Sequence, residues 1–600
     1  MTPRPPQVSA AKPRLRLLHV GSLLLSSGLL LLGVTGSSAP SQSPADRVHA
    51  AADALEAYDL EHSIASRLQN GLPIEELPDI TAAGAARDAA FYWQQLANVD
   101  GIQDSQLGED DAVSLAVLRR IARDEVEASR FSGLTMPVTP YSSPLRTVEQ
   151  AFSMHPLQNP KDAEHYLTLL HRVAPWIGTF EARLREQASR GVVLAAPEIP
   201  LAAGPFATAR QEGSKSPFAV SEARLEALPA AGRAAFAKSV GETIRREVNP
   251  ALESLGKYLT GDYAKSAPPT VGLGQYAGGS EYYRFLVRFH TTLDLAPEQI
   301  HRIGLDEMDR ISKALEAVRQ QVGFAGTLAE FRKFLRTDAQ FFPKSADEIG
   351  ERMMKNQQRI LPRIPEFFAR TPKAPAGVER LATALEGSMT FGYYDPPNPA
   401  HAKGLYYYNG SKLDQRSMLT SAALVAHELV PGHHFQIALQ RENTALPAFR
   451  QSYFTTAYVE GWGEYASDLA EQMGMYQDPY DHAGRLMMDA HLSGRLVVDT
   501  GMNALGWSRE RAMQYLSDNT LLSETEVATE TLRYACDLPG QALAYKMGMK
   551  KMVELRERAR AVLGPRFDIR QFHDLVLGGG SMPMNVLEQR VDRWIAAALH

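Results

Sequence analysis

Cysteine is almost absent from this chain, which holds Cys536 and no other among its 600 residues. A single thiol excludes an intramolecular disulfide framework, a cysteine-rich zinc module and an iron–sulfur cluster. Because no cysteine follows the apolar run near the N-terminus, lipid attachment at that point is excluded as well. Neither a disulfide scaffold nor a thiolate cluster is therefore available to this protein.

The chain also lacks a surplus of basic charge. It has 63 Lys and Arg residues against 69 Asp and Glu residues, which gives a formal net charge of −6. Such a balance does not attract a phosphate backbone, so we expect no nucleic-acid partner. With 44% hydrophobic and 22% charged residues, the composition is that of an ordinary globular protein. The length is enough for several domains or for one large enzyme.

The N-terminus has the layout of a secretory signal peptide. Arg14 and Arg16 precede the Leu-rich stretch 17–34, which holds no acidic residue, and small residues follow it. This order predicts a signal peptide over residues 1–39 and a polar leader over 40–46. The mature chain would then be exported to the periplasm or the exterior and would keep no membrane span. An uncleaved membrane anchor is the alternative, because the stretch approaches the roughly 20 apolar residues that a bilayer requires.

Helical periodicity dominates the rest of the chain. Apolar residues recur at three- and four-residue spacing over 111–131, 234–248, 298–322 and 347–360. Strand patterns are few, and the clearest lie over 404–408 and 389–394. The small and turn-forming residues over 267–279 form the best internal boundary. We therefore predict a mainly α fold with a small β-sheet, divided into an N-terminal helical region 47–266 and a C-terminal region 280–600.

Three histidines fall within eight residues, in the run AHELVPGHHFQ. A catalytic zinc ion takes three protein ligands, commonly two histidines and one glutamate, and the usual helical pattern is H-E-x-x-H. Here Pro431 occupies the position four residues after His427, so the second ligand must be His433 or His434. At about 100° per residue, an undistorted helix would bring His434 nearly into line with His427. Pro431 and Gly432 distort such a helix, and a bulge there would return His433 to that position instead.

The residues around these histidines resemble the signature of the domain-of-unknown-function 885 family. That family comprises bacterial proteins, many of them exported, which are grouped with the thermolysin-like zinc peptidases. The matching run is His427-Glu428-x-x-Pro431-Gly432-His433-His434-x-Gln436. In the signature the histidine directly after Pro-Gly is the constant one, so the resemblance implies His433 as a ligand and His434 as the second choice. It also implies a large helical metallopeptidase-like body with the small sheet beside the active-site helix.

A third ligand is expected from an acidic residue on a following helix. The run Tyr458-Val-Glu460-Gly-Trp-Gly-Glu464-Tyr465 resembles the Glu-Gly-Trp segment of the family, which implies Glu460 as that ligand. Glu464 lies one helical turn further on the same face, where its carboxylate would orient a ligand histidine. Gln436, and His434 if it is not a ligand, are further candidates for orienting a ligand or contacting the substrate.

Further landmarks of the family lie between about residues 280 and 585. They include Gly279-Ser-Glu281-Tyr-Tyr283, Arg495-Leu-Val-Val-Asp499-Thr-Gly501, Arg533-Tyr534, Pro539-Gly-Gln541-Ala-Leu-Ala-Tyr545 and Phe572-His573-Asp574. Related helical peptidases keep a catalytic tyrosine after their zinc ligands, so the resemblance makes Tyr545 the first candidate and Tyr534 the second for stabilising an oxyanion. Arg495 and Arg533 would hold a substrate carboxylate or form structural ion pairs. One departure is Asn503, which stands where the pattern Asp-Thr-Gly-x-His has its histidine and cannot act as an acid or base.

These residues together predict an exported zinc-dependent peptidase acting on short peptides, with its catalytic region over 280–600. Glu428, next to His427, would take the proton of a metal-activated water as general base. The strand over 404–408, with Asn409, would offer an edge that pairs with an extended peptide. The alternatives are a metal-dependent amidase with a non-peptide substrate and a non-catalytic exported binding protein. The intact Glu428 speaks against the last of these.

Overall fold

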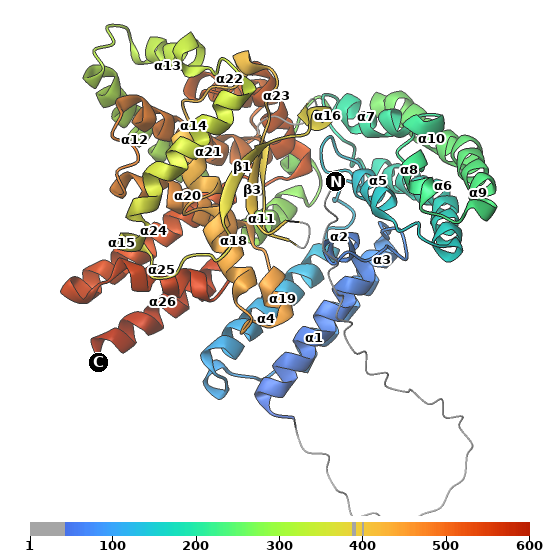
Figure 1. Cartoon of the computed structure of the whole chain (residues 1–600), viewed down its shortest axis with the longest axis horizontal. Helices are drawn as coiled ribbons and strands as arrows, with labels where there is room; N and C mark the ends of the chain where they lie inside the picture. Colours follow the sequence, from blue (N-terminus) through green and yellow to red (C-terminus); the bar gives the residue numbers. More distant parts are fainter. Residues whose placement is uncertain (1–41, 387–391, 399–400) are drawn as a thin grey trace, which may run out of the picture. The chain divides into compact units, whose positions relative to one another are not determined.

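The computed structural model describes residues 42–386, 392–398 and 401–600, and residues 44–600 belong to one unit (Figure 1). The predicted signal peptide and the first residues of the leader lie outside the described residues, as does the start of the strand predicted over 389–394. None of the described helices combines the length and the apolarity that crossing a bilayer requires. The prediction of a mainly α fold with a small β-sheet is confirmed.

Helices make up nearly all of the N-terminal half. They are α1 (Pro44–His62), α2 (Ile64–Gln69), α3 (Ala82–Asn98), α4 (Glu109–Ser129), α5 (Pro144–Met154), α6 (Pro160–Ser189), α7 (Ile199–Ala209), α8 (Glu222–Glu226), α9 (Ala230–Thr243) and α10 (Asn249–Tyr258). The middle of the chain adds α11 (Gly279–Thr291), α12 (Pro297–Gln321), α13 (Leu328–Thr337), α14 (Ala346–Ile360), α15 (Ile364–Phe367) and α16 (Thr383–Glu386). Three of the four predicted helices correspond to α4, α12 and α14 within about two residues, while α9 ends at Thr243 and continues as a π-helical turn.

The C-terminal part carries the candidate site. Its helices are α17 (Ser421–Glu428), α18 (His433–Glu442), α19 (Ala448–Ser452), α20 (Thr456–Gln472), α21 (Pro479–Ala504), α22 (Arg509–Asn519), α23 (Glu524–Leu532), α24 (Leu543–Leu563), α25 (Ile569–Gly578) and α26 (Met584–Leu599), with the π-helix η9 (Arg533–Asp537) between α23 and α24. The segment α17 is short and apolar, and its residues Ala422, Ala423, Val425 and Ala426 are all buried. A helix that is apolar on every side belongs in a core, and α17 lies in the largest core of the protein.

Two separate cores divide the N-terminal helices. The helices α5, α6, α7, α9 and α10 pack around one core, which includes Phe180, Phe206 and Leu255. In contrast, Val48 of α1 and Val113 of α4 belong to the core that also contains α17, α20 and α24. The N-terminal helices therefore do not all stand apart from the C-terminal region, and the domain boundary over 267–279 stays a prediction.

The sheet has three strands in the order β1-β3-β2. The central strand β3 (Gly404–Tyr408) pairs in parallel with β1 (Ala376–Arg380) and antiparallel with β2 (Gly392–Asp395). The prediction that β3 offers a free edge to a substrate is therefore wrong, because both of its edges are already hydrogen-bonded within the sheet. Aromatic and β-forming residues predict a strand but not its neighbours, and here the free edges belong to β1 and β2.

Candidate metal centre

The helix that begins at Ser421 stops at Glu428, and a new helix begins at His433. Pro431 lacks the backbone N–H that a continuing helix needs. At Gly432 the chain passes so close over the preceding turn that a Cβ atom would lie 1.7 Å from the carbonyl oxygen of His427. Only glycine fits this approach. The helix is therefore interrupted at Pro431 and Gly432, where the sequence predicts a distortion, and the straight helix that would have used His434 does not form.

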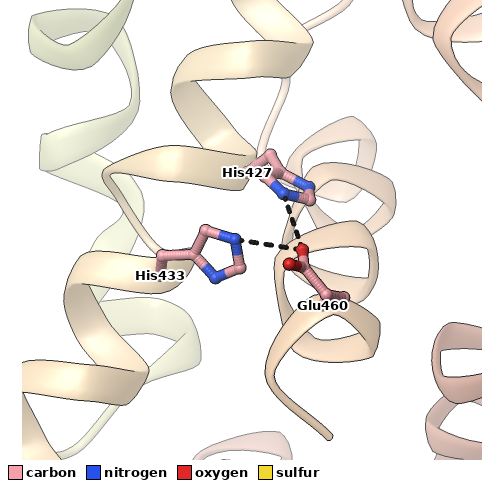
Figure 2. A group of neighbouring side chains, drawn as sticks. All are labelled: His427, His433 and Glu460. Atoms are coloured by element: carbon pink, nitrogen blue, oxygen red, sulfur yellow. Dashed lines mark ion pairs between the residues drawn. The ribbon is translucent and has the colours of Figure 1, made fainter. Parts of the chain in front are cut away.

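This break brings the side chains of His427 and His433 close together between the two helices. Their ring centroids are 4.6 Å apart, with the planes nearly perpendicular. Nε2 of His427 lies 3.7 Å and Nε2 of His433 lies 3.3 Å from Oε2 of Glu460, which comes from α20 (Figure 2). Within the part of the chain that the structure describes, these three residues form the one group whose possible ligand atoms all lie within 4.8 Å of one another.

The segment that carries Glu460 is shaped by its two glycines. A Cβ atom at Gly463 would lie 2.8 Å from Cε1 of His427, so the imidazole ring rests against the backbone of α20. A Cβ atom at Gly461 would lie 2.7 Å from the backbone of Gly548 on α24. Glycine at these two positions therefore lets a ligand ring and a neighbouring helix both approach α20 closely.

Trp462 lies between these glycines and holds the helix break in place. Its indole N–H donates a hydrogen bond to the carbonyl oxygen of Pro431 at 3.0 Å, and its side chain is fully buried. A buried carbonyl needs a donor, and after the break at Pro431 the helix no longer supplies one. The Glu-Gly-Trp segment implies Glu460 as a ligand from the sequence, but it predicts no role for Trp462.

Glu464 lies behind His427 as expected. Its Oε1 is 2.8 Å from Nδ1 of His427, although the contact is off the line of the N–H bond, and its Oε2 is 3.3 Å from Nη1 of Arg485 on α21. Burial opposes protonation of His427, but the carboxylates of Glu460 and Glu464 raise its pKa to about 10. Burial also disfavours a charged Glu460, yet the two histidines hold the pKa of its carboxyl well below its usual range. Arg485 was missed from the sequence, because nothing in its local pattern distinguishes it from other helical arginines.

His434 points away from the centre. Its Nδ1 lies 2.9 Å from the hydroxyl of Tyr394 on β2, and its Nε2 lies 2.9 Å from the carbonyl oxygen of Ala374 just before β1. Both ring nitrogens are thus occupied, and His434 attaches the sheet to α18. Gln436 is buried on α18 and donates to Oε1 of Gln440 at 2.7 Å, while its own Oε1 has no hydrogen-bond partner within the described residues.

A cavity of about 360 Å³ opens beside the three converging residues. His427, Glu428, Glu464 and Tyr545 all contribute to its wall. Burial raises the pKa of the Glu428 carboxyl, although His433 and His427 counteract part of this effect. Burial and the charge of Glu460 also raise the pKa of the Tyr545 hydroxyl, which therefore stays protonated.

The second tyrosine candidate lies elsewhere. Tyr534 is fully buried in a different core cluster, and it is absent from the cavity wall. Its hydroxyl donates to Glu530 and accepts a hydrogen bond of 2.9 Å from Nε of Arg495. Of the two candidate tyrosines, only Tyr545 lines the same cavity as Glu428.

The two asparagines singled out from the sequence have structural surroundings. Asn409 is buried, where its side chain donates to the carbonyl oxygen of Glu386 and accepts two hydrogen bonds from Ser411. Asn503 is also fully buried. It accepts a hydrogen bond from the N–H of Leu273 and donates to the carbonyl oxygens of Asp499 and Tyr534 at 3.0 Å. Neither residue lines the cavity beside Glu428.

The family model for bacterial proteins of unknown function (DUF885) matches residues 65–591 of the chain. The chain belongs to this family. The resemblance read from the histidine motif is thereby confirmed, whereas the kinship of DUF885 with thermolysin-like peptidases stays a prediction. No protein with a curated description matches the chain significantly.

Two solved structures resemble this DUF885 protein over nearly the whole chain. A "putative lipoprotein" from Colwellia psychrerythraea is 25% identical with a TM-score of 0.81, over 92% of this chain and 100% of the other. A "putative lipoprotein of unknown function" from Shewanella oneidensis is 18% identical with a TM-score of 0.71, over 92% of this chain and 99% of the other. The second likeness concerns the fold alone, and neither description names an activity.

Proposed function

We propose that this DUF885 protein is an exported zinc-dependent peptidase that hydrolyses short peptides. The observation that carries the proposal is the convergence of two imidazole nitrogens and one carboxylate oxygen beside a cavity with Glu428 in its wall. Each element of this arrangement has a separate role in the hydrolysis of an amide bond.

The three converging residues fit a zinc ion. Two histidines and one glutamate are a common catalytic ligand set that leaves a fourth position open. Ligands about 2.1 Å from a tetrahedral ion lie roughly 3.4 Å from one another, and the two Nε2 atoms lie 3.7 and 3.3 Å from Oε2 of Glu460. Glu464 on the far side of the His427 ring matches the carboxylate that commonly orients a ligand histidine. A zinc ion bound there supplies Lewis acidity, which acidifies a water molecule and polarises a carbonyl group.

Glu428 is the proton carrier of the proposed reaction. It adjoins His427 in the chain and lines the same cavity, where burial raises the pKa of its carboxyl. A carboxylate with a raised pKa is a better base near neutral pH. Glu428 accepts the proton of the attacking water and delivers it to the leaving amine. The raised pKa of Tyr545 keeps its hydroxyl protonated near neutral pH. This hydroxyl donates a hydrogen bond to the oxyanion that forms.

The cavity suits part of a peptide chain. Much of its wall is apolar. The apolar residues include Leu424, Met487, Met488, Leu492, Leu521 and Leu522. A few polar groups in a mostly apolar pocket orient a substrate, while the apolar surface provides affinity. A volume of about 360 Å³ holds only a few residues, which favours short peptides.

Export is supported by two independent features. The N-terminus has the layout of a signal peptide, and the structural neighbour from Colwellia psychrerythraea is described as a "putative lipoprotein". This chain has no cysteine near its apolar run, so it is exported without the lipid-bearing cysteine of a lipoprotein.

The proposal is tested by metal analysis and by digestion of a peptide library, read by mass spectrometry with and without a chelator. We expect about one zinc ion per chain, and cleavage of peptides that stops on chelation and returns when zinc is added. A chain that takes up no transition metal would refute the zinc site. A zinc-loaded chain that cleaves no peptide but hydrolyses a non-peptide amide would replace the peptidase by the amidase.

A further inference from the structure

One wall of the cavity beside Glu428 carries two arginines. Arg495 and Arg533 both line the cavity, and both contact Glu530. Nε and Nη2 of Arg495 donate to Oε2 of Glu530 at 3.0 and 2.9 Å, whereas Nη1 of Arg533 lies 3.3 Å from Oε1. A single carboxylate thus serves two guanidinium groups, so neither arginine has Glu530 to itself.

Arg533 has the more available guanidinium group of the two. Arg495 is buried, and its guanidinium donates hydrogen bonds to Glu530 and to the hydroxyl of Tyr534. Arg533 is more open, with 22% of its side chain exposed, and its second contact is the neutral Oε1 of Gln541 at 2.6 Å. A guanidinium group has five N–H donors, of which Glu530 and Gln541 accept two, so donors remain for a further acceptor.

The other acidic residues of this wall are already engaged. Glu464 faces His427 and Arg485. Glu526 accepts hydrogen bonds of 2.7 and 2.8 Å from the N–H and the hydroxyl of Ser523, which cap the start of α23. Of the acids that line this cavity, Glu530 is the one that the described residues show in an ion pair with Arg533, and Arg495 shares it. An exposed guanidinium of this kind is suited to bidentate binding of a carboxylate.

Tyr545 connects Arg533 with the metal centre. The guanidinium of Arg495 stacks on the Tyr545 ring, 4.8 Å from its centroid. Burial raises the pKa of the Tyr545 hydroxyl, Glu460 raises it further, and the neighbouring Arg533 and Arg495 counteract this rise. Glu460 and Arg533 are thus both close enough to Tyr545 to act on its hydroxyl. A carboxylate at Arg533 would belong to a residue close to the scissile bond.

We propose that Arg533 binds the free C-terminal carboxylate of a peptide substrate, while the wall formed by Met487, Met488, Leu492, Leu521 and Leu522 accepts an apolar side chain next to it. This inference rests on the proposed peptidase function and adds a mode of action to it. The protein then releases a short unit from the C-terminus of peptides that end in an apolar residue, rather than cutting inside longer chains.

The first test compares two substrates that differ only at the C-terminus. One is an acetylated pentapeptide of four alanines and a final leucine with a free carboxylate, and the other is its C-terminal amide. We expect the zinc-loaded wild-type chain to prefer the free acid by about 100-fold in kcat/KM, because the amide leaves Arg533 without a charged partner. Equal turnover of the two peptides would overturn the role of Arg533 and leave the peptidase proposal standing.

Substitution of Arg533 supplies the matching half of the test. Arg533→Gln is expected to lower kcat/KM for the free acid by about 100-fold and to lower that for the amide far less, so that the preference for the free acid is lost, while a circular-dichroism spectrum like that of the wild type shows that the variant is folded. Arg533→Lys keeps the charge but not the fork of donors, so it should restore part of the preference. The matched control is Arg511→Gln, since Arg511 stacks on Trp507 and lies away from the cavity. A control that loses the preference as well would refute the assignment.

A binding measurement separates this inference from the proposed function. In the Glu428→Gln background, isothermal titration calorimetry with the same two peptides reports affinity without turnover. We expect the free acid to bind at least about 10-fold more tightly than the amide, and the difference to vanish on adding Arg533→Gln. Binding of the free acid without hydrolysis by the wild-type chain would refute the peptidase and support the carboxylate site. Equal binding of both peptides would refute the carboxylate site alone.

Discussion

The indole N–H of Trp462 lies 3.0 Å from the carbonyl oxygen of Pro431. This hydrogen bond connects the helix that carries Glu460 with the break that separates His427 from His433. All three candidate ligands are therefore joined through one buried contact between α20 and the segment linking α17 to α18. The position of the break relative to α20 decides which histidine faces Glu460.

Loss of that contact should weaken the fold and the metal site together. Trp462→Phe removes the donor and leaves the Pro431 carbonyl buried without a partner, which costs about 1–3 kcal/mol of unfolding free energy. We expect a lower melting temperature in the metal-free chain and weaker zinc binding by isothermal titration. Trp507→Phe is the control, because Trp507 is half-buried and lies against Arg511 rather than at the break. Unchanged zinc affinity in Trp462→Phe would show that the break is held by other contacts.

The two adjacent histidines should behave differently. His433→Ala removes a ligand nitrogen and is expected to abolish stoichiometric zinc binding. His434→Ala should retain the metal, because its two ring nitrogens contact Tyr394 and Ala374, and should mainly loosen the attachment of the sheet to α18. The zinc content after dialysis, measured by inductively coupled plasma mass spectrometry, distinguishes the two variants. A metal-free His434→Ala beside a metal-replete His433→Ala would reverse the assignment.

Glu428 should affect turnover but not metal content. Glu428→Gln keeps the size of the side chain and removes its basicity, so we expect kcat to fall by about 100- to 10,000-fold with zinc still bound at about one ion per chain. Glu460→Gln is the matched comparison, since it should lose metal and activity together. A Glu428→Gln variant with kcat close to the wild-type value would show that another group takes the proton.

His573 should make the fold sensitive to acid. Its Nδ1 donates to the carbonyl oxygen of Phe367 and its Nε2 accepts from the hydroxyl of Tyr465, both at 2.8 Å, which requires the neutral ring. Burial, together with the nearby charge of Arg556, lowers its pKa to about 3, although the hydrogen bond to Phe367 opposes the shift. An unfolded histidine takes up a proton below about pH 6.5. The stability that this neutral ring contributes is thus complete above about pH 6.5 and is lost as the pH falls toward 3.

Calorimetry of the metal-free chain at pH 7.5 and pH 5.0 checks this prediction. Between these conditions the wild type should lose about 2 kcal/mol of stability through His573, whereas His573→Gln should lose less. The control is His171→Gln, because His171 is exposed and paired with Glu247 at the surface. If His573→Gln and the wild type lost equal stability, the buried ring would not be the group that titrates.

The ligand set could be predicted from the sequence because its signals are local. His427, Pro431, Gly432 and His433 lie within seven residues, and the chemistry of proline and glycine alone indicates a break between the histidines. The partners behind the ligands are different. Arg485 reaches Glu464 only because the fold brings this part of α21 near α20, and no sequence pattern around Arg485 predicts that contact.

The tyrosines and the strand show the same limit. Tyr534 and Tyr545 both lie in family landmarks and are both candidates from the sequence. The π-helix η9 and the turn after it place Tyr534 in a core and Tyr545 at the cavity. A π-helix changes the angular position of every residue that follows it, and its presence cannot be read from helical periodicity. Likewise β3 was recognised as a strand, yet its central position depends on β1 and β2, which pair with it from other parts of the chain.

At Gly461 and Gly548 the main chains of α20 and α24 touch directly, and a Cβ atom at Gly548 would lie 1.9 Å from the carbonyl oxygen of Ala457. The spacing between the backbones of α20 and α24, which carry Glu460 and Tyr545, is consequently set by direct contact of the two main chains. The wall of the cavity also contains Met487 and Met488, whose unbranched side chains adapt to many shapes. Under the proposed function, this combination of a fixed helix contact and adaptable methionine side chains would let the cavity accept different apolar side chains of a substrate.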